Sequence, residues 1–168
     1  MRFAQLFLAG VLSFIMTASA QAETLILDTS KGEIRISLLS TLAPNHVTRI
    51  KELVKDGYYD GIIFHRVIPG FMAQTGDPTG TGMGGSGQKL DAEFSDYQYV
   101  SGTVGMARTM DPNSADSQFF ICFDGCGHLT GQYTVWGQVE TGMEVVEAIN
   151  AGEPPAEPDQ IISARLAD

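Results

Sequence analysis

Short β-prone apolar runs, separated by turns rich in glycine, proline and aspartate, make up most of residues 23–168. Runs of this length with many β-branched and aromatic residues predict strands. The predicted strands lie at 24–28, at 33–38, in a hairpin within 64–78, and at 103–108, 117–123, 133–139 and 161–166. Because about eight strands that do not alternate with helices favour an antiparallel sheet, we expect a mainly β fold closed into a barrel.

Two segments have the spacing of amphipathic helices instead. The first begins at Pro44 and ends at Gly57, and its apolar residues recur every three or four positions on one face. The second covers residues 142–150. We expect both helices to cover the ends of the barrel, and we expect His46, in the first turn of the first helix, to be solvated.

The hairpin within 64–78 carries the most informative polar residues. Pro69-Gly70 separates its two apolar runs, and this pair favours a tight turn because proline presets φ and glycine accepts positive φ. Strand alternation places Arg66 and Gln74 on one face beside Phe71. An arginine and an amide beside a large aromatic ring suggest a shallow apolar site edged by hydrogen-bond donors. An arginine within a strand is also typical of a solvated surface, so both interpretations stay open here.

The N-terminus has the pattern of an export signal. A single arginine precedes an apolar run that is shorter than the ~20 residues of a membrane span, and small residues follow the run. We therefore predict a cleaved signal peptide at 1–22, with cleavage after Ala22 and Ala20 as the alternative. One domain at 23–168 would remain, without a membrane association.

The charge and the cysteine content limit the classes of partner and cofactor that the protein could bind. The formal charge of −10 is a poor match for nucleic acid, which binds basic surfaces. Cys122 and Cys126 leave three interpretations open: free thiols, a disulfide, or part of a metal site with His128. The metal interpretation is the weakest because a fourth ligand is missing, and we predict neither metal nor cofactor. The glycine-rich segment 77–87 lacks the Gly-Lys-Ser/Thr of a phosphate-binding loop.

Four longer stretches together resemble the cyclophilin family of peptidyl-prolyl cis-trans isomerases. They are YYDGIIFHRVIPGFMAQTGDP (58–78), GTGMGGSG (80–87), VGMARTMDPNSADSQFFIC (104–122) and HLTGQYTVWGQV (128–139). The resemblance implies a closed eight-stranded antiparallel β-barrel capped by two α-helices, with the site on one outer face. It also implies an exported bacterial member in the periplasm, and we expect a monomer that acts on proline-containing segments of folding exported proteins.

Carried over position by position, the resemblance implies one catalytic residue, Arg66. The residues that would line the pocket for the substrate's proline ring are Phe71, Met72, Phe120 and Leu129. The residues that would hold or border the peptide are His65, Gln74, Gly82, Ala107, Arg108, Gln118, His128 and Tyr133. Three features depart from the family pattern. Thr75 replaces a usual glycine and is expected to shift its strand slightly, and Met110-Asp111-Pro112 belongs to a loop variant typical of bacterial forms that is expected to be harmless. His128 replaces a Trp or Phe, which implies weak cyclosporin sensitivity.

The chemistry of proline isomerisation explains these residue types. Rotation about a peptide bond costs ~18–20 kcal/mol because resonance stiffens it, and a catalyst needs neither nucleophile nor metal to lower that barrier. Arg66 could donate to the proline nitrogen in the twisted state. A binding module or holdase that recognises proline-containing segments without useful turnover is the rival hypothesis. A serine hydrolase is disfavoured because no serine lies in a Gly-x-Ser-x-Gly pattern.

Overall fold

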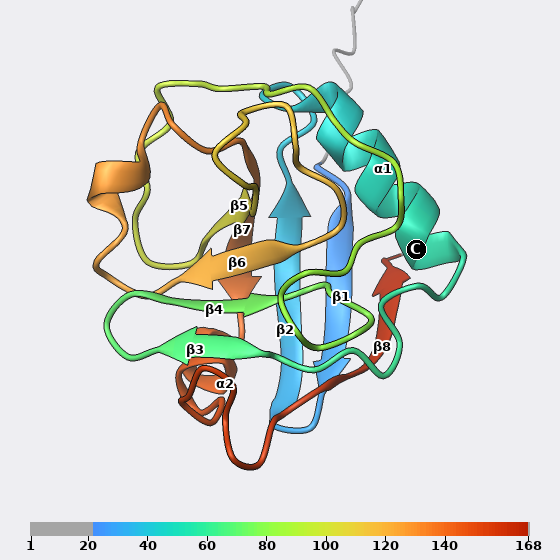
Figure 1. Cartoon of the computed structure of the whole chain (residues 1–168), viewed down its shortest axis with the longest axis vertical. Helices are drawn as coiled ribbons and strands as arrows, with labels where there is room; N and C mark the ends of the chain where they lie inside the picture. Colours follow the sequence, from blue (N-terminus) through green and yellow to red (C-terminus); the bar gives the residue numbers. More distant parts are fainter. Residues whose placement is uncertain (1–21, 168) are drawn as a thin grey trace, which may run out of the picture.

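The apolar runs pair into one antiparallel sheet with the strand order β3-β4-β6-β5-β7-β2-β1-β8, shown in Figure 1. This computed structural model describes residues 22–167, so the predicted signal segment falls almost entirely outside the described residues. The strands are β1 Thr24–Thr29, β2 Gly32–Leu38, β3 Arg66–Ile68, β4 Met72–Thr75, β5 Thr103–Met106, β6 Phe119–Cys122, β7 Val135–Thr141 and β8 Ile161–Leu166.

The sheet is an open, curled half-barrel, so the prediction of a closed barrel is wrong. Within residues 22–167 the two end strands, β3 and β8, share no ladder of pairs. The loop before β8 occupies the free edge of β3 instead: Val67 and Gly152 exchange backbone hydrogen bonds of 2.8 and 2.9 Å. The ends of the sheet meet where the segment before β3 runs beside the start of β8: Ile63 and Gln160 form an isolated bridge, and the Ile161 N–H donates to the Ile62 carbonyl at 2.8 Å.

Two helices pack against the sheet, within the two segments that the sequence predicts to be helical. Helix α1 (Pro44–Lys55) lies along the side of the sheet formed by β1 and β8, and the short α2 (Met143–Glu147) lies near the far end of β2 (Figure 1). A third, single-turn 3-10 helix, η1, covers Gly127–Leu129. Strand alternation turns the apolar side chains of β1 and β2 into the core, where the largest fully buried side chain is that of Trp136. No helix in the described part of the chain combines the length and apolarity of a membrane crossing.

His46 is buried rather than solvated, which corrects the expectation for the first turn of α1. Its Nδ1 lies 2.6 Å from a carboxylate oxygen of Glu93, and Glu93 also accepts the backbone N–H groups of Asn45 and His46 at 3.0 and 2.9 Å. Burial acts to raise the pKa of Glu93, but the hydrogen bonds from His46 and Asn45 outweigh it and leave the pKa below its usual value. A residue far along the chain therefore caps α1.

Candidate functional site

The β3–β4 hairpin places a charged and a polar side chain opposite each other. Arg66 pairs with Gln74 across the ladder, so both project from the same face of the sheet. The turn is closed by a 3.0 Å hydrogen bond from the Phe71 N–H to the Ile68 carbonyl, and Gly70 has a φ of +74°, as the Pro-Gly pair predicts. The local geometry expected from the sequence is thus the geometry of the structure.

An apolar pocket of about 120 Å³ opens beside this hairpin. Its lining residues are Arg66, Phe71, Met72, Gln74, Ala107, Arg108, Phe120, Leu129 and Tyr133. The buried side chains of Met72, Phe120 and Leu129 form its apolar part, while Phe71 and Tyr133 are half-buried. The ring of Phe120 packs between Tyr99, stacked at 5.9 Å, and Tyr133, edge-on at 5.8 Å. The structure therefore brings together, in one cavity, nine residues that the resemblance implied.

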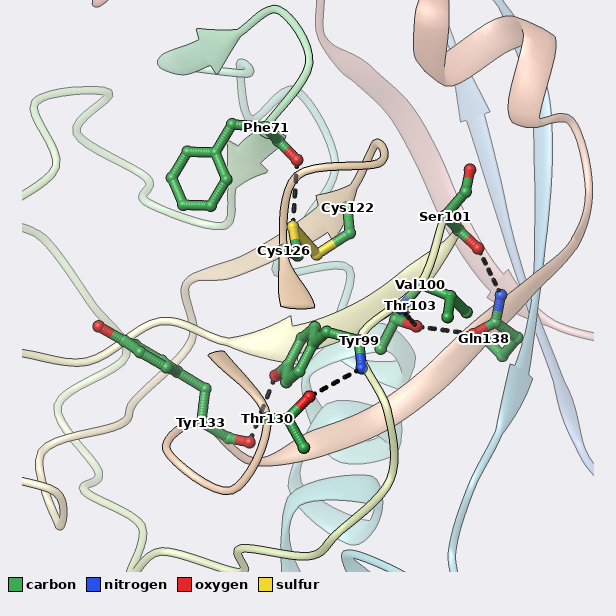
Figure 2. The surroundings of a disulfide bond; sticks show 10 residues. All are labelled: Phe71, Tyr99, Val100, Ser101, Thr103, Cys122, Cys126, Thr130, Tyr133 and Gln138. Atoms are coloured by element: carbon green, nitrogen blue, oxygen red, sulfur yellow. Dashed lines mark hydrogen bonds between the residues drawn. A yellow bond between two sulfur atoms is a disulfide. The ribbon is translucent and has the colours of Figure 1, made fainter. Parts of the chain in front are cut away.

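The segment 126–133, which carries part of the pocket wall, is held at three points (Figure 2). Cys126 forms a disulfide with Cys122 of β6, and its sulfur lies 3.1 Å from the carbonyl oxygen of Phe71. The backbone N–H of Tyr99 donates to Thr130, and the hydroxyl of Tyr99 donates to the Tyr133 carbonyl at 3.3 Å. The loop is consequently fixed against β6 and the neighbouring segment, although it contains little regular structure.

Of the three interpretations of the cysteine pair, the structure contains the disulfide. Both cysteines are completely buried and belong to a second apolar cluster, separate from the main core, that also includes Met72, Phe120 and Leu129. The disulfide therefore lies directly behind the pocket wall. Within residues 22–167, no three His, Cys, Asp or Glu side chains are grouped as a metal site would require.

A relay of side-chain amides connects the pocket to the glycine-rich loop. The amide nitrogen of Gln74 donates to the Gln118 side-chain oxygen at 2.9 Å, and the Gln118 amide nitrogen donates to the carbonyls of Gly82 and Gly84 at 3.0 and 2.8 Å. Beside this relay lies a second groove of about 160 Å³. Its lining residues are Gln74, Gly82, Met83, Gly84, Lys89, Ala107, Arg108, Thr109, Ser114, Asp116 and Gln118.

Buried carboxylates organise the glycine-rich loop. Asp77, only 1% exposed, accepts the backbone N–H groups of Thr79 at 2.7 Å and of Gly82 at 2.6 Å. Burial acts to raise the pKa of Asp77, but the hydrogen bonds from Thr79, Gly84 and Gly82 outweigh it and hold the pKa well below its usual value. A side chain at Gly84 would overlap the Asp77 carboxylate, so only glycine fits there. The loop therefore follows the carboxylate with its backbone.

His65 lines a third, wider groove of about 540 Å³ on the other side of Arg66. Its lining residues are His65, Arg66, Gln74, Gly80, Thr81, Gly82, Arg108, Glu153 and Pro154. His65 is 5% exposed, and neither ring nitrogen has a hydrogen-bond partner among the described residues. Burial lowers its pKa, with a further lowering from Arg66 that is opposed by Asp77. The ring is therefore kept neutral near pH 7, with one nitrogen available as a donor and the other as an acceptor.

Arg108 and His128 are placed differently from the other candidates. The Arg108 guanidinium lies 4.4 Å above the ring of Tyr133 and donates to the Gln132 carbonyl at 2.7 and 3.1 Å, so it supports the pocket wall. His128 is exposed on η1 and lines none of the three cavities, although its ring centroid is 5.5 Å from that of Phe71. It borders the pocket only through Phe71.

Thr75, another departure from the family pattern, is fully buried in β4. Its hydroxyl donates to the Ile63 carbonyl at 2.9 Å, and β4 stays in register with β6 through the Thr75–Phe119 pair. The hydroxyl is therefore satisfied without a break in the ladder.

Several residues around the grooves were not among the sequence candidates. The most important is Glu153, whose carboxylate lies 2.7 Å from the Nε of Arg66. It occurs in the proline-rich segment 152–159, and nothing in its local sequence predicts the contact. Asp116 is a second such residue, and its carboxylate accepts the Ser86 N–H at 2.6 Å and the Gly87 N–H at 3.0 Å. Acidic residues separated so widely from their partners in the chain give no periodic signal.

Comparison with known proteins places this geometry in a family. Residues 24–166 match the family model described as "Cyclophilin type peptidyl-prolyl cis-trans isomerase/CLD". The chain is 46% identical over 179 aligned positions to a probable peptidyl-prolyl cis-trans isomerase of Brucella suis, covering 95% of this chain and 91% of the relative. It is 43% identical over 143 positions to a peptidyl-prolyl cis-trans isomerase of Synechococcus elongatus, covering 84% and 94% respectively.

Solved structures agree with the family model. A cyclophilin from Hirschia baltica has a TM-score of 0.76 at 32% identity, covering 84% of this chain and 73% of that protein. A cyclophilin type peptidyl-prolyl cis-trans isomerase from Cryptosporidium parvum has a TM-score of 0.82 at 30% identity, covering 88% and 98%. The same Cryptosporidium protein was also solved in the presence of the dipeptide Ala-Pro, with a TM-score of 0.80.

Proposed function

Because this chain belongs to the cyclophilin family of peptidyl-prolyl cis-trans isomerases and is such an enzyme, we propose that it accelerates X-Pro isomerisation in exported proteins while they fold, with Arg66 as its catalytic residue. The observation that carries the assignment of Arg66 is its place among the lining residues of the apolar pocket, directly opposite Gln74 in the ladder. The Ala-Pro dipeptide used with the Cryptosporidium relative supports a proline ring as the occupant of the pocket.

The proposed mechanism divides the work between the pocket and the arginine. The rings and apolar chains around Phe120 hold the proline ring, and polar groups near Gln74 hold the residues before it, so the bond between the two is the one that rotates. In the twisted state the proline nitrogen loses resonance and gains a lone pair that can accept a hydrogen bond. The guanidinium of Arg66 carries N–H donors and can donate one of them to that lone pair. Because this hydrogen bond exists only in the twisted state, it lowers the barrier without strengthening ground-state binding.

A protease-coupled assay on an Ala-Pro-Phe peptide tests the catalytic assignment. We expect Arg66→Ala to lower kcat/KM by about a hundredfold or more, as removal of a main electrostatic contributor does. Arg165→Ala is the matched control, since Arg165 is exposed on β8 and pairs with Asp28 and Glu33. If the wild-type protein binds proline-containing peptides but both it and Arg66→Ala turn them over equally slowly, the protein acts as a binding module instead.

Export is a separate part of the proposal. It is supported by the arginine, the apolar run and the small residues at 1–22, a pattern typical of signal peptides. We expect residues 1–22 fused to a reporter that is active only outside the cytoplasm to give activity, with mass spectrometry of the cell-envelope fraction showing an N-terminus at residue 23. A reporter that stays inactive would contradict periplasmic location and leave the isomerase assignment intact.

A further inference from the structure

In the described part of the chain Arg66 has one hydrogen-bond partner, Glu153, which lines the same wide groove as Arg66 and His65. The Nε of Arg66 donates to the Glu153 carboxylate at 2.7 Å, and no other nitrogen of its guanidinium makes a hydrogen bond within residues 22–167. The two residues are 87 positions apart, and their side chains are 42% and 55% exposed. The short distance is that of a charge-assisted hydrogen bond. The two terminal nitrogens of the Arg66 guanidinium therefore remain available to another acceptor.

The loop that carries Glu153 is anchored immediately beside β3. Gly152 exchanges hydrogen bonds of 2.8 and 2.9 Å with Val67, the residue after Arg66. Further along, Asp159 accepts the Asn150 N–H at 2.8 Å and the Ser30 hydroxyl at 2.6 Å, which holds the loop at its other end. Gly152 has a φ of +150°, and a Cβ there would lie 2.5 Å from Pro155. The backbone under Glu153 thus has a defined position relative to Arg66.

Gln74, the nearest other candidate to hold Arg66, has a different partner. It faces Arg66 directly across the ladder, but its amide nitrogen donates to Gln118, which in turn is bonded to Gly82 and Gly84. The Gln74 side chain therefore belongs to the relay that supports the glycine-rich loop. Glu153 is left as the group that determines the direction of the Arg66 side chain.

We propose that Glu153 is a positioning residue for Arg66: its carboxylate fixes the Nε side of the guanidinium so that the terminal nitrogens are aimed at the substrate. This inference rests on the proposed catalytic role of Arg66. An exposed ion pair contributes little to stability, so folding does not require this contact. Catalysis is more sensitive, because a donor that must meet a lone pair formed only in the twisted state acts best when it is already oriented.

The test compares Glu153→Ala and Glu153→Gln with Glu157→Ala, the matched control on the same loop, whose side chain is exposed. Two-dimensional exchange NMR on a proline peptide separates the interconversion rate on the enzyme from the dissociation constant. We expect Glu153→Ala to lower the on-enzyme rate about tenfold, with binding changed by less than about twofold. Glu153→Gln, which keeps an acceptor oxygen, should recover part of the rate, and Glu157→Ala should match the wild type.

A double-mutant cycle and one spectroscopic signature distinguish positioning from a structural effect. In an Arg66→Ala background, Glu153→Ala should have no further effect on the rate, because its only route of action has been removed. In Glu153→Ala, 15N relaxation of the Arg66 Nε–H group should show a more mobile side chain than in the wild type. An unchanged rate in Glu153→Ala, or an equal loss in the Arg66→Ala background, would overturn the positioning role. If Arg66→Ala itself leaves the rate unchanged, the proposed catalytic mechanism fails instead, which is a separate result.

Discussion

The apolar pocket and the groove beside the glycine-rich loop share Gln74, Ala107 and Arg108, yet the pocket and the loop are held together by opposite means. The pocket consists of side chains on short strands, packed ring against ring around Phe120 and backed by a disulfide. The loop contributes mostly backbone, and its shape follows the buried carboxylate of Asp77. Packing changes little with pH, whereas protonation removes the charge of a carboxylate and turns one of its two acceptor oxygens into a donor. We therefore expect the apolar pocket and the glycine-rich loop to lose their structure under different conditions.

Phe120→Ala should have the largest effect, and it tests whether packing holds the apolar pocket together. Phe120 is 4% exposed and contacts both Tyr99 and Tyr133, so its removal leaves a cavity between two rings. We expect a loss of about 3–5 kcal/mol in the free energy of unfolding, together with weaker peptide binding. Urea unfolding and a peptide titration measure the two effects. Phe94→Ala is the control, because Phe94 is 42% exposed and should cost far less.

Asp77→Asn tests whether the buried carboxylate holds the glycine-rich loop together. We expect it to destabilise the protein by about 2–3 kcal/mol at pH 7, because an amide nitrogen would face N–H donors that the carboxylate now accepts. The pKa of Asp77 is held below its usual value, so its contribution is complete above the unfolded value of about 4 and is lost as the pH falls toward the folded value. Urea midpoints of wild type and variant should therefore converge below about pH 4, and a constant difference down to pH 2 would contradict this account.

Reduction of the disulfide should sharpen the contrast between the apolar pocket and the glycine-rich loop. Opening a loop as short as that between Cys122 and Cys126 is expected to cost about 2 kcal/mol by the loop-entropy relation, and the loss should fall on the segment 126–133. Hydrogen exchange of the Cys122→Ser/Cys126→Ser variant should show lost protection near η1. Protection in the glycine-rich loop should stay as in the wild type. An equal loss of protection in the segment 126–133 and in the glycine-rich loop would mean that the stabilities of the two regions are coupled.

The smallest expected effect concerns His128, at the rim of the pocket. Its ring borders Phe71 at 5.5 Å between centroids but lines none of the three cavities. His128→Trp should strengthen cyclosporin binding by about two- to tenfold, since an aromatic contact contributes about 0.5–1.5 kcal/mol. Isothermal titration of the two proteins measures this, and tight binding by the wild type would show that His128 does not weaken cyclosporin binding. Peptide turnover should change little.

By itself the sequence determined the local features of this protein. Alternation, β-branched runs and turn residues act over a few positions, and they correctly predicted the strands, the Pro69-Gly70 turn and the shared face of Arg66 and Gln74. The ordered motifs then implied the pocket residues that the structure brings together. The strands and the turn could be predicted because they depend on residues that are neighbours in the chain. The pocket residues could be predicted because they belong to motifs that the chain shares with a family.

Only the tertiary structure decided the contacts that join distant segments. The sheet stays open because Gly152, rather than β8, takes the edge of β3, and the same loop delivers Glu153 to Arg66. Glu93 reaches the first turn of α1 in a similar way and buries His46. A carboxylate on a loop has the same local pattern whether it is solvated or paired. Its partner depends on how the chain is folded over tens of residues, which no local periodicity records.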